Sequence, residues 1–86
     1  MQVFFHKRFE KQFAKLTHRT QLRFKGKLKQ FYINPLDSSL NNHALKGEFL
    51  GQRSINVTPD IRAVYQVVNE EGFLFTHIGS HSELYS

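Results

Sequence analysis

The chain has 86 residues, no cysteine and a formal net charge of +5 at pH 7, so it has room for one core and no thiols for disulfides or thiolate metal sites. No stretch approaches the roughly 18 consecutive apolar residues of a membrane-spanning helix, and the opening residues lack the apolar run and small-residue cleavage site of a signal peptide. We therefore expect one domain over residues 1–86, in a cytoplasmic protein with no membrane contact.

The positive charge is concentrated in the first part of the chain. Residues 1–33 hold nine lysines and arginines and one acidic residue, whereas residues 34–86 hold three and six. This asymmetry is typical of a surface that meets a polyanion or an acidic protein. Charge alone supports equally well a solvated helix face that keeps the protein in solution.

The first half of the chain predicts a strand and two helices. Residues 2–6 are rich in β formers, and the next apolar residues recur at helical spacing, at Phe5, Phe9, Phe13 and Leu16. Thr17 is a suitable N-cap for a second helix over residues 18–33. The pair Asn34-Pro35 ends this helix, because proline disfavours the helical conformation in the residue before it.

The second half predicts a sheet. Residues 35–42 have loop composition, and strands are expected over 48–58, interrupted at Gly51, then over 60–68 and 73–78. Phe49, Ile55 and Val57 are expected to point inward. The order is β-α-α-β-β-β, an α+β fold in which a helical hairpin packs on a small antiparallel sheet. The last three strands form a meander, and the first strand is an edge or pairs within the sheet.

Local motifs exclude several kinds of site. Five histidines are present, but no two lie four residues apart on a predicted helix, so we expect no metal site and no cofactor. Ser80 precedes His81 without the G-x-S-x-G motif of a nucleophile elbow, and no glycine-rich phosphate loop occurs.

Six polar residues remain that could converge on the open face of the sheet: His43, Arg53, Asn56, Asp60, Arg62 and His81. Arg53 and Asn56 are an odd number of positions apart, so they share a face only if the strand has a bulge or bend. Each also has an ordinary structural interpretation. His43 could lie in a loop, Asp60 could shape a turn, and the arginines could pair with Glu48 or Glu83.

The segments "HALKGEFLGQRSINVTPDIRAVYQV" and "HIGSHSELYS" resemble the RelE/ParE superfamily of small bacterial toxins, and within it the YafQ-like branch. Shared features are an H-x-L-x-G segment, an R-x-x-x-V-x-P-D turn and a G-[ST]-H-x-x-L-[FY] ending. The likeness is close over residues 43–86, and the order of elements agrees over residues 1–42. Each motif is weak alone, but together, in this order, they are fairly specific.

This resemblance implies a ribosome-dependent endonuclease that cuts messenger RNA in the ribosomal A site without metal. The sugar 2′-OH attacks the adjacent phosphate and leaves a 2′,3′-cyclic phosphate and a 5′-OH. The implied partners are the ribosome, messenger RNA and an acidic antitoxin, with promoter DNA reached only through the antitoxin complex. Lys25, Lys27 and Lys29 would then contact ribosomal RNA, whose binding is driven by counterion release.

The resemblance also implies roles for individual residues. His81 is the expected general acid, because histidine exchanges protons near neutral pH, and either His43 or Asp60 is the base. Two arginines, Arg53 and Arg62, would hold the scissile phosphate. Tyr85 would stack on a base.

Asn56 departs from the YafQ pattern, which has a histidine at this position. Asparagine can orient a phosphate or a water but cannot exchange a proton, so activity could be weaker, differently distributed or lost. Two alternatives stay open: a ParE-like toxin that binds DNA gyrase without catalysis, and an impaired toxin that only binds antitoxin. We also expect Gly79 to turn the chain so that His81 faces the sheet, and His77 to be an ordinary strand residue.

Overall fold

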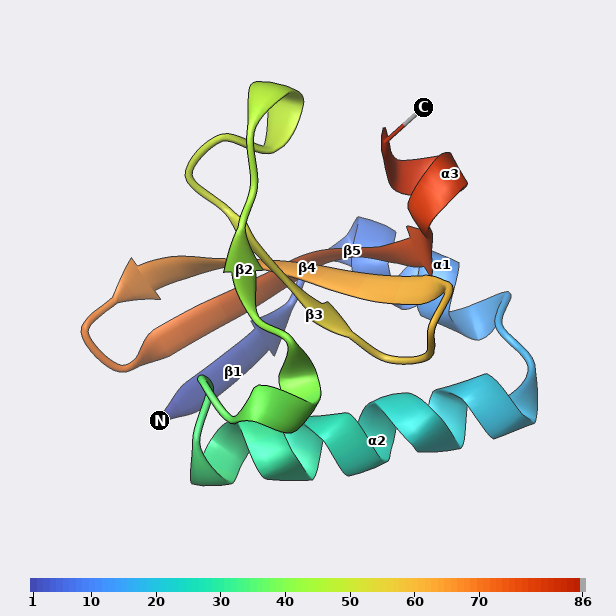
Figure 1. Cartoon of the computed structure of the whole chain (residues 1–86), viewed down its shortest axis with the longest axis horizontal. Coiled ribbons are helices and arrows are strands. Elements are labelled where there is room, and N and C mark those ends of the chain that lie inside the picture. The colour runs from blue at the N-terminus through green and yellow to red at the C-terminus, as the bar shows by residue number, and fades with distance from the viewer. Residues whose placement is uncertain (86) are drawn as a thin grey trace.

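The computed structural model describes residues 1–85 and has an α+β fold around a five-stranded mixed sheet in the order β1-β5-β4-β3-β2 (Figure 1). Along the chain the elements, with η for a short 3₁₀ helix, are β1 (Gln2–Phe5), α1 (Lys7–Ala14), α2 (His18–Ile33), η1 (Ser38–Leu40), β2 (His43–Ala44), η2 (Gly47–Phe49), β3 (Arg53–Asn56), β4 (Ile61–Asn69), β5 (Gly72–Ser80) and α3 (His81–Tyr85). The predicted strand, helices and meander are therefore present. None of the helices in residues 1–85 has the length and apolar character needed to cross a membrane.

Side-chain caps begin both long helices. Nδ1 of His6 accepts a hydrogen bond from the backbone N–H of Arg8, so the residue that follows β1 also caps α1. Oγ1 of Thr17 accepts from the N–H of Thr20 and caps α2, as predicted. Each cap satisfies a backbone donor that has no partner within the first turn of its helix.

The sheet consists of the predicted meander, the predicted first strand β1, and a short strand β2 that was not expected. β3, β4 and β5 pair antiparallel in chain order, and β1 pairs parallel with β5 as an edge strand. The short strand β2 pairs with β3 and forms the other edge, in a segment where no strand was expected.

Helix α1 takes the place of a strand beside β5. β1 pairs only with residues 72–75 of β5. Beyond that point Nε of Arg8 donates to the carbonyl of Thr76 at 3.2 Å, and Oε1 of Gln12 accepts from the N–H of Ile78 at 2.9 Å. Polar side chains of α1 thus satisfy backbone groups that the end of β1 leaves unpaired.

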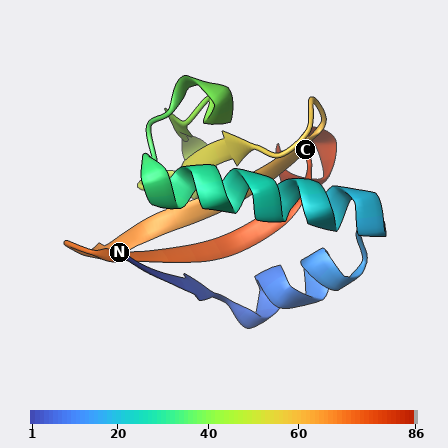
Figure 2. The ribbon, with the colours of Figure 1, turned by 90° about the horizontal axis from the view of Figure 1, so that it is seen from below.

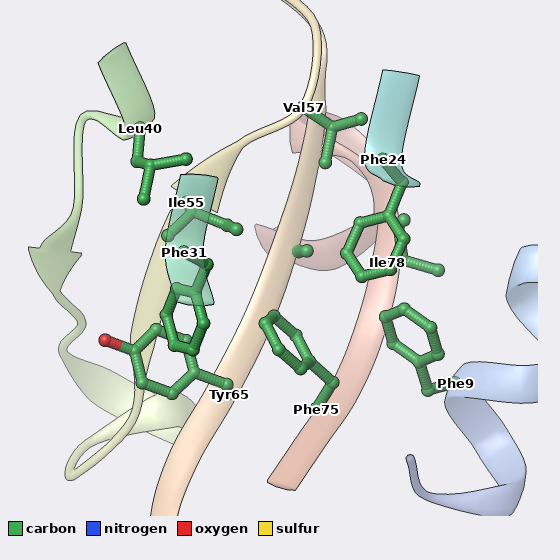
Figure 3. Close-up of a cluster of buried hydrophobic side chains, with 10 residues drawn as sticks. Phe9, Phe24, Phe31, Leu40, Ile55, Val57, Tyr65, Phe75 and Ile78 are labelled. Atoms are coloured by element: carbon green, nitrogen blue, oxygen red, sulfur yellow. The ribbon is translucent and has the colours of Figure 1, made fainter. Parts of the chain in front are cut away.

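The main core lies between α2 and the sheet face that α2 crosses (Figures 2 and 3). Phe24 and Phe31 of α2 are buried against Phe75 of β5, with ring centroids 5.6 and 5.5 Å apart, and Phe9 of α1 closes one end. This aromatic contact supplies apolar burial that a chain of this length needs. A register shift in β5 beside Thr76 places Phe75 and Ile78 on the same face, although they are an odd number of residues apart.

The predicted strand over residues 48–58 is wrong in its first half. Residues 47–49 form η2, and Gly51 has a φ of +91°, a left-handed conformation that favours glycine. Ile55 and Val57 point into the core as expected. Phe49 does not, because η2 carries it to the opposite face of the sheet.

Candidate functional site

The sheet face opposite α2 carries two short segments, a lobe of residues 45–52 that contains η2, and helix α3 (Figure 1). Between them is a cleft of about 260 Å³, lined by Lys46, Gly47, Glu48, Phe49, Leu84 and Tyr85. Its aromatic side chains belong to a continuous row of rings. The Phe49 ring lies 5.0 Å from that of His77 and 5.6 Å from that of Tyr85, and the His81 ring lies 4.8 Å from Tyr85.

A reciprocal capping box holds the start of α3. Oγ of Ser80 accepts a hydrogen bond from the N–H of Glu83 at 3.1 Å, and Oε1 of Glu83 accepts from the N–H of Ser80 at 2.8 Å. This S-x-x-E arrangement satisfies two backbone donors at once. Hydrogen bonding to the carboxylate by the backbone N–H of Ser80, and then by its hydroxyl, lowers the pKa of Glu83. His81, the first residue of α3, is thereby held in place although it is exposed.

The expected role of Gly79 as a turn residue is wrong, because Gly79 lies inside β5 and its φ is not positive. A Cβ atom at this position would come within 3.3 Å of Oε1 of Glu83. A side chain here would therefore displace the capping carboxylate by a few tenths of an ångström.

Asp60 and Arg62 lie next to the start of α3. The carbonyl of Asp60, in the turn between β3 and β4, accepts from the N–H of His81 at 3.1 Å. Arg62 is paired with Asn56 on one side and with Gly79 on the other. Its Nη1 donates to the carbonyls of Thr58 and Pro59, which leaves its other nitrogens without a hydrogen bond within residues 1–85. The structure therefore brings together Asn56, Asp60, Arg62 and His81.

Three buried polar atoms of the described residues have no hydrogen-bond partner: Oγ of Ser54, Oδ1 of Asn56 and the hydroxyl of Tyr85. Ser54 and Asn56 occupy alternate positions of β3, so they share a face of the sheet, and this face carries Arg62. Unpaired buried polar atoms are uncommon in proteins. The three atoms lie on the side of the sheet that carries the cleft, but each is covered by other protein atoms.

Arg53 lies apart from this group. β3 pairs with β4 without a register shift, and Arg53 is opposite Tyr65, on the face that packs against α2. Its Nε donates to Oδ1 of Asn42 at 2.7 Å, and Asn42 donates to the hydroxyl of Tyr65. The bulge that would place Arg53 beside Asn56 is absent from β3.

His43 is exposed on β2, three strands from β5, or roughly 14 Å across the sheet. Its Nδ1 lies 2.9 Å from the carbonyl oxygen of Asn41. Since a carbonyl only accepts, Nδ1 carries the proton, and Nε2 of the neutral ring is free to accept one. His43 thus has a form suited to a base, but it is distant from His81, whereas Asp60 is adjacent to it.

The three lysines occupy the other layer of the molecule. Lys25 and Lys29 are exposed on α2, and Nζ of Lys27 donates to the carbonyl of Ser39 at 3.1 Å. Because α2 covers the face opposite the cleft (Figure 1), these lysines and His81 lie on opposite sides of the sheet.

His77 differs from the ordinary strand residue that its sequence position indicates. Burial, followed by the positive charges of Arg8 and His6, lowers the pKa of His77 to about 4. Its Nδ1 lies 2.9 Å from Oγ1 of Thr76, whose single proton is donated to Oε1 of Gln52. Nδ1 therefore carries the proton of a neutral ring, and Nε2 is free. No sequence motif marks His77, Phe49 or Arg8, because their contacts depend on how β5, η2 and α1 meet.

Comparison with known proteins identifies the family. The family model described as "Bacterial toxin of type II toxin-antitoxin system, YafQ" matches residues 1–86. The chain belongs to the YafQ toxin family. It is therefore a toxin of a type II toxin-antitoxin system. No curated protein sequence matches the chain significantly.

Solved structures of YafQ and related toxins share the fold. YafQ from Escherichia coli BL21(DE3) is 22% identical, with a TM-score of 0.79 over 98% of this chain and 97% of that one. YafQ in the E. coli DinJ-YafQ toxin-antitoxin complex is 24% identical, with a TM-score of 0.76 over 98% and 96%. A copper-bound mutant toxin from Helicobacter pylori is 28% identical, with a TM-score of 0.71 over 99% of both chains.

Proposed function

We propose that this YafQ-family toxin is an endoribonuclease that cuts messenger RNA in the A site of the ribosome and so stops translation and growth. The observation that carries the proposal is the position of His81. This histidine is held by the capping box at the rim of the cleft, next to Asp60, with Arg62 in the adjoining strand. A proton donor, a carboxylate and a guanidinium beside unpaired polar atoms form a set of groups suited to phosphodiester chemistry.

The proposed reaction is an internal transesterification. The 2′-oxygen of the ribose attacks the adjacent phosphorus, and the bond from phosphorus to the 5′-oxygen breaks. A base accepts the 2′-OH proton, and His81 donates a proton to the departing 5′-oxygen. The products are a 2′,3′-cyclic phosphate and a 5′-OH end, and no oxidant or external nucleophile is needed.

His43 and Asp60 both remain candidates for the base. Asp60 is supported by its place beside His81, and His43 by its free Nε2. Asn56 can orient the substrate but cannot accept the proton. Charge on the phosphate would be met by Arg62, while the hydrogen bond of Arg53 to Asn42 supports a role in holding β2 and β3 instead.

The cleft is a suitable place for a nucleobase next to the cut. Phe49 and Tyr85 form its aromatic walls, and Lys46 and Glu48 lie on its polar side. Base stacking on an aromatic ring typically contributes about 1–3 kcal/mol. Dependence on the ribosome follows if the ribosome positions the 2′-OH in line with the leaving oxygen.

The proposal includes no metal. A Helicobacter pylori relative has been solved with copper bound. In residues 1–85 of this chain no three histidine, cysteine, aspartate or glutamate side chains cluster as a metal site would require. The groups beside His81 can carry out the transesterification as an acid, a base and a cation.

We also propose that an acidic antitoxin binds this toxin in the cytoplasm, and that promoter DNA is reached only through that complex. DinJ is the antitoxin in the solved complex of the E. coli relative. In this chain, nine of the twelve lysines and arginines lie in residues 1–33. A partly disordered acidic chain that folds on binding would be complementary to that surface.

Induced expression of wild-type toxin and of His81→Ala in a bacterium without the antitoxin tests the function. We expect wild-type toxin to arrest growth and to produce new 5′ ends inside translated codons, and His81→Ala to do neither. His18→Ala, an exposed histidine at the start of α2, is the matched control and should behave as wild type. Arrest without cleavage would indicate a gyrase-directed toxin, and no arrest by wild type would indicate a toxin that has lost its chemistry.

Purified variants distinguish the two candidate bases. Cleavage of ribosome-bound message at saturating toxin should fall about 100-fold or more when the base is removed. Asp60→Asn and His43→Gln keep approximate size and polarity, so the variant with the large loss identifies the base. A small effect of both would reject this part of the mechanism while leaving the result for His81 intact.

A further inference from the structure

A group of nitrogen-bearing side chains, His6, Arg8 and His77, lies on the far side of β5 from the turn that contains Asp60. Beyond the end of β1, the N–H of His6 donates to the carbonyl of Phe75 at 2.9 Å, and Nε of Arg8 donates to the carbonyl of Thr76 at 3.2 Å. His77 is the next residue of β5. These backbone contacts bring His6 and Arg8, from the start of α1, alongside the imidazole of His77.

All three side chains keep unused polar groups. Arg8 commits only Nε, so neither terminal nitrogen of its guanidinium has a hydrogen bond within the described chain. Nδ1 of His6 accepts from the N–H of Arg8, which leaves Nε2 as the donor of the neutral ring. Nε2 of His77 is free, since Nδ1 is engaged with Thr76.

No carboxylate compensates this charge. The groups that act on His77 are its burial and the positive charges of Arg8 and His6, and no acid is among them. On its other sides His77 faces Val64 of β4 and the ring of Phe49 in η2, which carry no charge. Glu10, the acidic residue of α1, lines a separate apolar groove with Phe5, Phe13 and Phe24.

The cluster is connected to the cleft by the row of rings. Phe49 contacts His77 with one edge and Tyr85 with another, and Tyr85 contacts His81. A nucleic-acid strand that places one phosphate beside His81 can therefore continue across Phe49 toward Arg8. Alternating aromatic and cationic groups of this kind follow the alternation of bases and phosphates in a single strand.

We propose that His6, Arg8 and His77 form a second phosphate site, which binds a phosphodiester of the RNA strand next to the one that is cut. The inference rests on the proposed function for the identity of its ligand. Arg8 provides two parallel N–H donors for the phosphate oxygens, and His6 provides a third. Burial first and the positive charge of Arg8 second lower the pKa of His77, and the arriving anion offsets that charge, so phosphate binding favours the protonated ring.

Nuclear magnetic resonance titration of the purified toxin with a 2′-deoxy tetranucleotide tests the site, since this probe cannot be cleaved. Saturating probe should raise the pKa of His77 above its value of about 4 in the free protein. Arg8→Gln should weaken binding about 10-fold, as expected for loss of charge-assisted hydrogen bonds. His6→Asn keeps an N-cap for α1 and should weaken binding less. Arg19→Gln, on the first turn of α2, is the matched control and should bind as wild type.

An unchanged pKa of His77 at saturating probe, or equal affinities for wild type and Arg8→Gln, would overturn the inference. Inorganic phosphate forms a second arm, and binding of phosphate with no added affinity for the tetranucleotide would also reject a site for an RNA strand. In the free protein Arg8→Gln should itself raise the pKa of His77, which checks that the two groups face one another.

Ribosomal cleavage separates this inference from the proposed function. If wild-type toxin cleaves and Arg8→Gln cleaves with an unchanged KM, the second site is rejected and the nuclease stands. If no variant cleaves but the tetranucleotide still binds through Arg8, the nuclease is rejected and the site stands. The nuclease and the second phosphate site are both supported if wild-type toxin cleaves and Arg8→Gln raises KM about 10-fold with little change in kcat.

Discussion

Two histidines only four residues apart have different environments in this toxin. His77 is half-buried beneath Phe49 and beside two positive charges, whereas His81 is exposed at the start of α3. Burial disfavours the charged form of an imidazole, and neighbouring cations add to this effect. The two histidines therefore differ because the fold partly buries His77 and leaves His81 at the surface.

The low pKa of His77 predicts a change of stability with pH. The unfolded chain takes up a proton near pH 6.5, whereas folded His77 does so only near pH 4. Unfolding therefore binds a proton in this window, and stability falls as the pH decreases from about 6.5 to 4. His77→Gln should show a smaller decrease of the urea midpoint than wild type between pH 7 and 4. Parallel curves for the two proteins would contradict the assignment.

At the level of elements, a short helix is stable because of its cap. Five residues are too few for an isolated helix to form in water. Three hydrogen bonds stabilise α3 instead. Two are the reciprocal bonds of Ser80 and Glu83, and the third runs from the N–H of His81 to the carbonyl of Asp60. The position of His81 therefore depends on Ser80 and Glu83, neither of which has a role in the proposed reaction.

Ser80→Ala should loosen α3 by about 1 kcal/mol, the usual cost of losing an N-cap, and reduce cleavage about fivefold. Hydrogen exchange of the amides in α3 should accelerate, while the global urea midpoint changes little. Ser80→Thr retains the hydroxyl and should restore activity. Ser38→Ala, an exposed serine of η1 whose hydroxyl has no hydrogen bond within residues 1–85, is the matched control with no expected effect. Full activity of Ser80→Ala would show that His81 does not need the cap.

At the level of the whole molecule, the candidate site and the exposed lysines of α2 lie on opposite sides of the sheet (Figure 1). The sheet lies between the two layers, with α2 and its exposed lysines on one side and the cleft with His81 on the other (Figure 1). Under the proposed function, messenger RNA occupies the cleft and a second polyanion contacts α2. Ribosomal RNA and an acidic antitoxin both fit the charge of that layer.

Charge reversal at Lys25 and Lys29 tests this separation. Lys27 is left unchanged because it bonds to the carbonyl of Ser39. The double variant Lys25→Glu, Lys29→Glu should raise KM for ribosomes and flatten its dependence on salt, while kcat is retained. The matched neutral variant, with glutamine at both positions, should give an intermediate KM. Equal association of all three proteins at several salt concentrations would exclude α2 from ribosome binding.

Much of the fold is predictable because its signals are local. Phenylalanines at helical spacing and the cap at Thr17 indicate α1 and α2, and β-branched residues indicate the meander. Alternating apolar residues predict a strand over residues 48–58, but residues 47–49 form η2. The positive φ of Gly51 and the short pairing of β2 interrupt that pattern, and neither has a strong local signal.

The amino-acid sequence was sufficient for the helices, the meander and the family, since periodicity, caps and motifs act over a few neighbouring residues. It also indicated His81, Asp60 and Arg62, which the fold brings together. Only the tertiary structure showed that Arg53 lies on the sheet face that packs against α2. It also showed the register shift at Thr76, which lets Phe75 and Ile78 both be buried, and the position of Arg8 beside His77. These features depend on strand register and on contacts between distant segments, whose energies no local pattern of residues records.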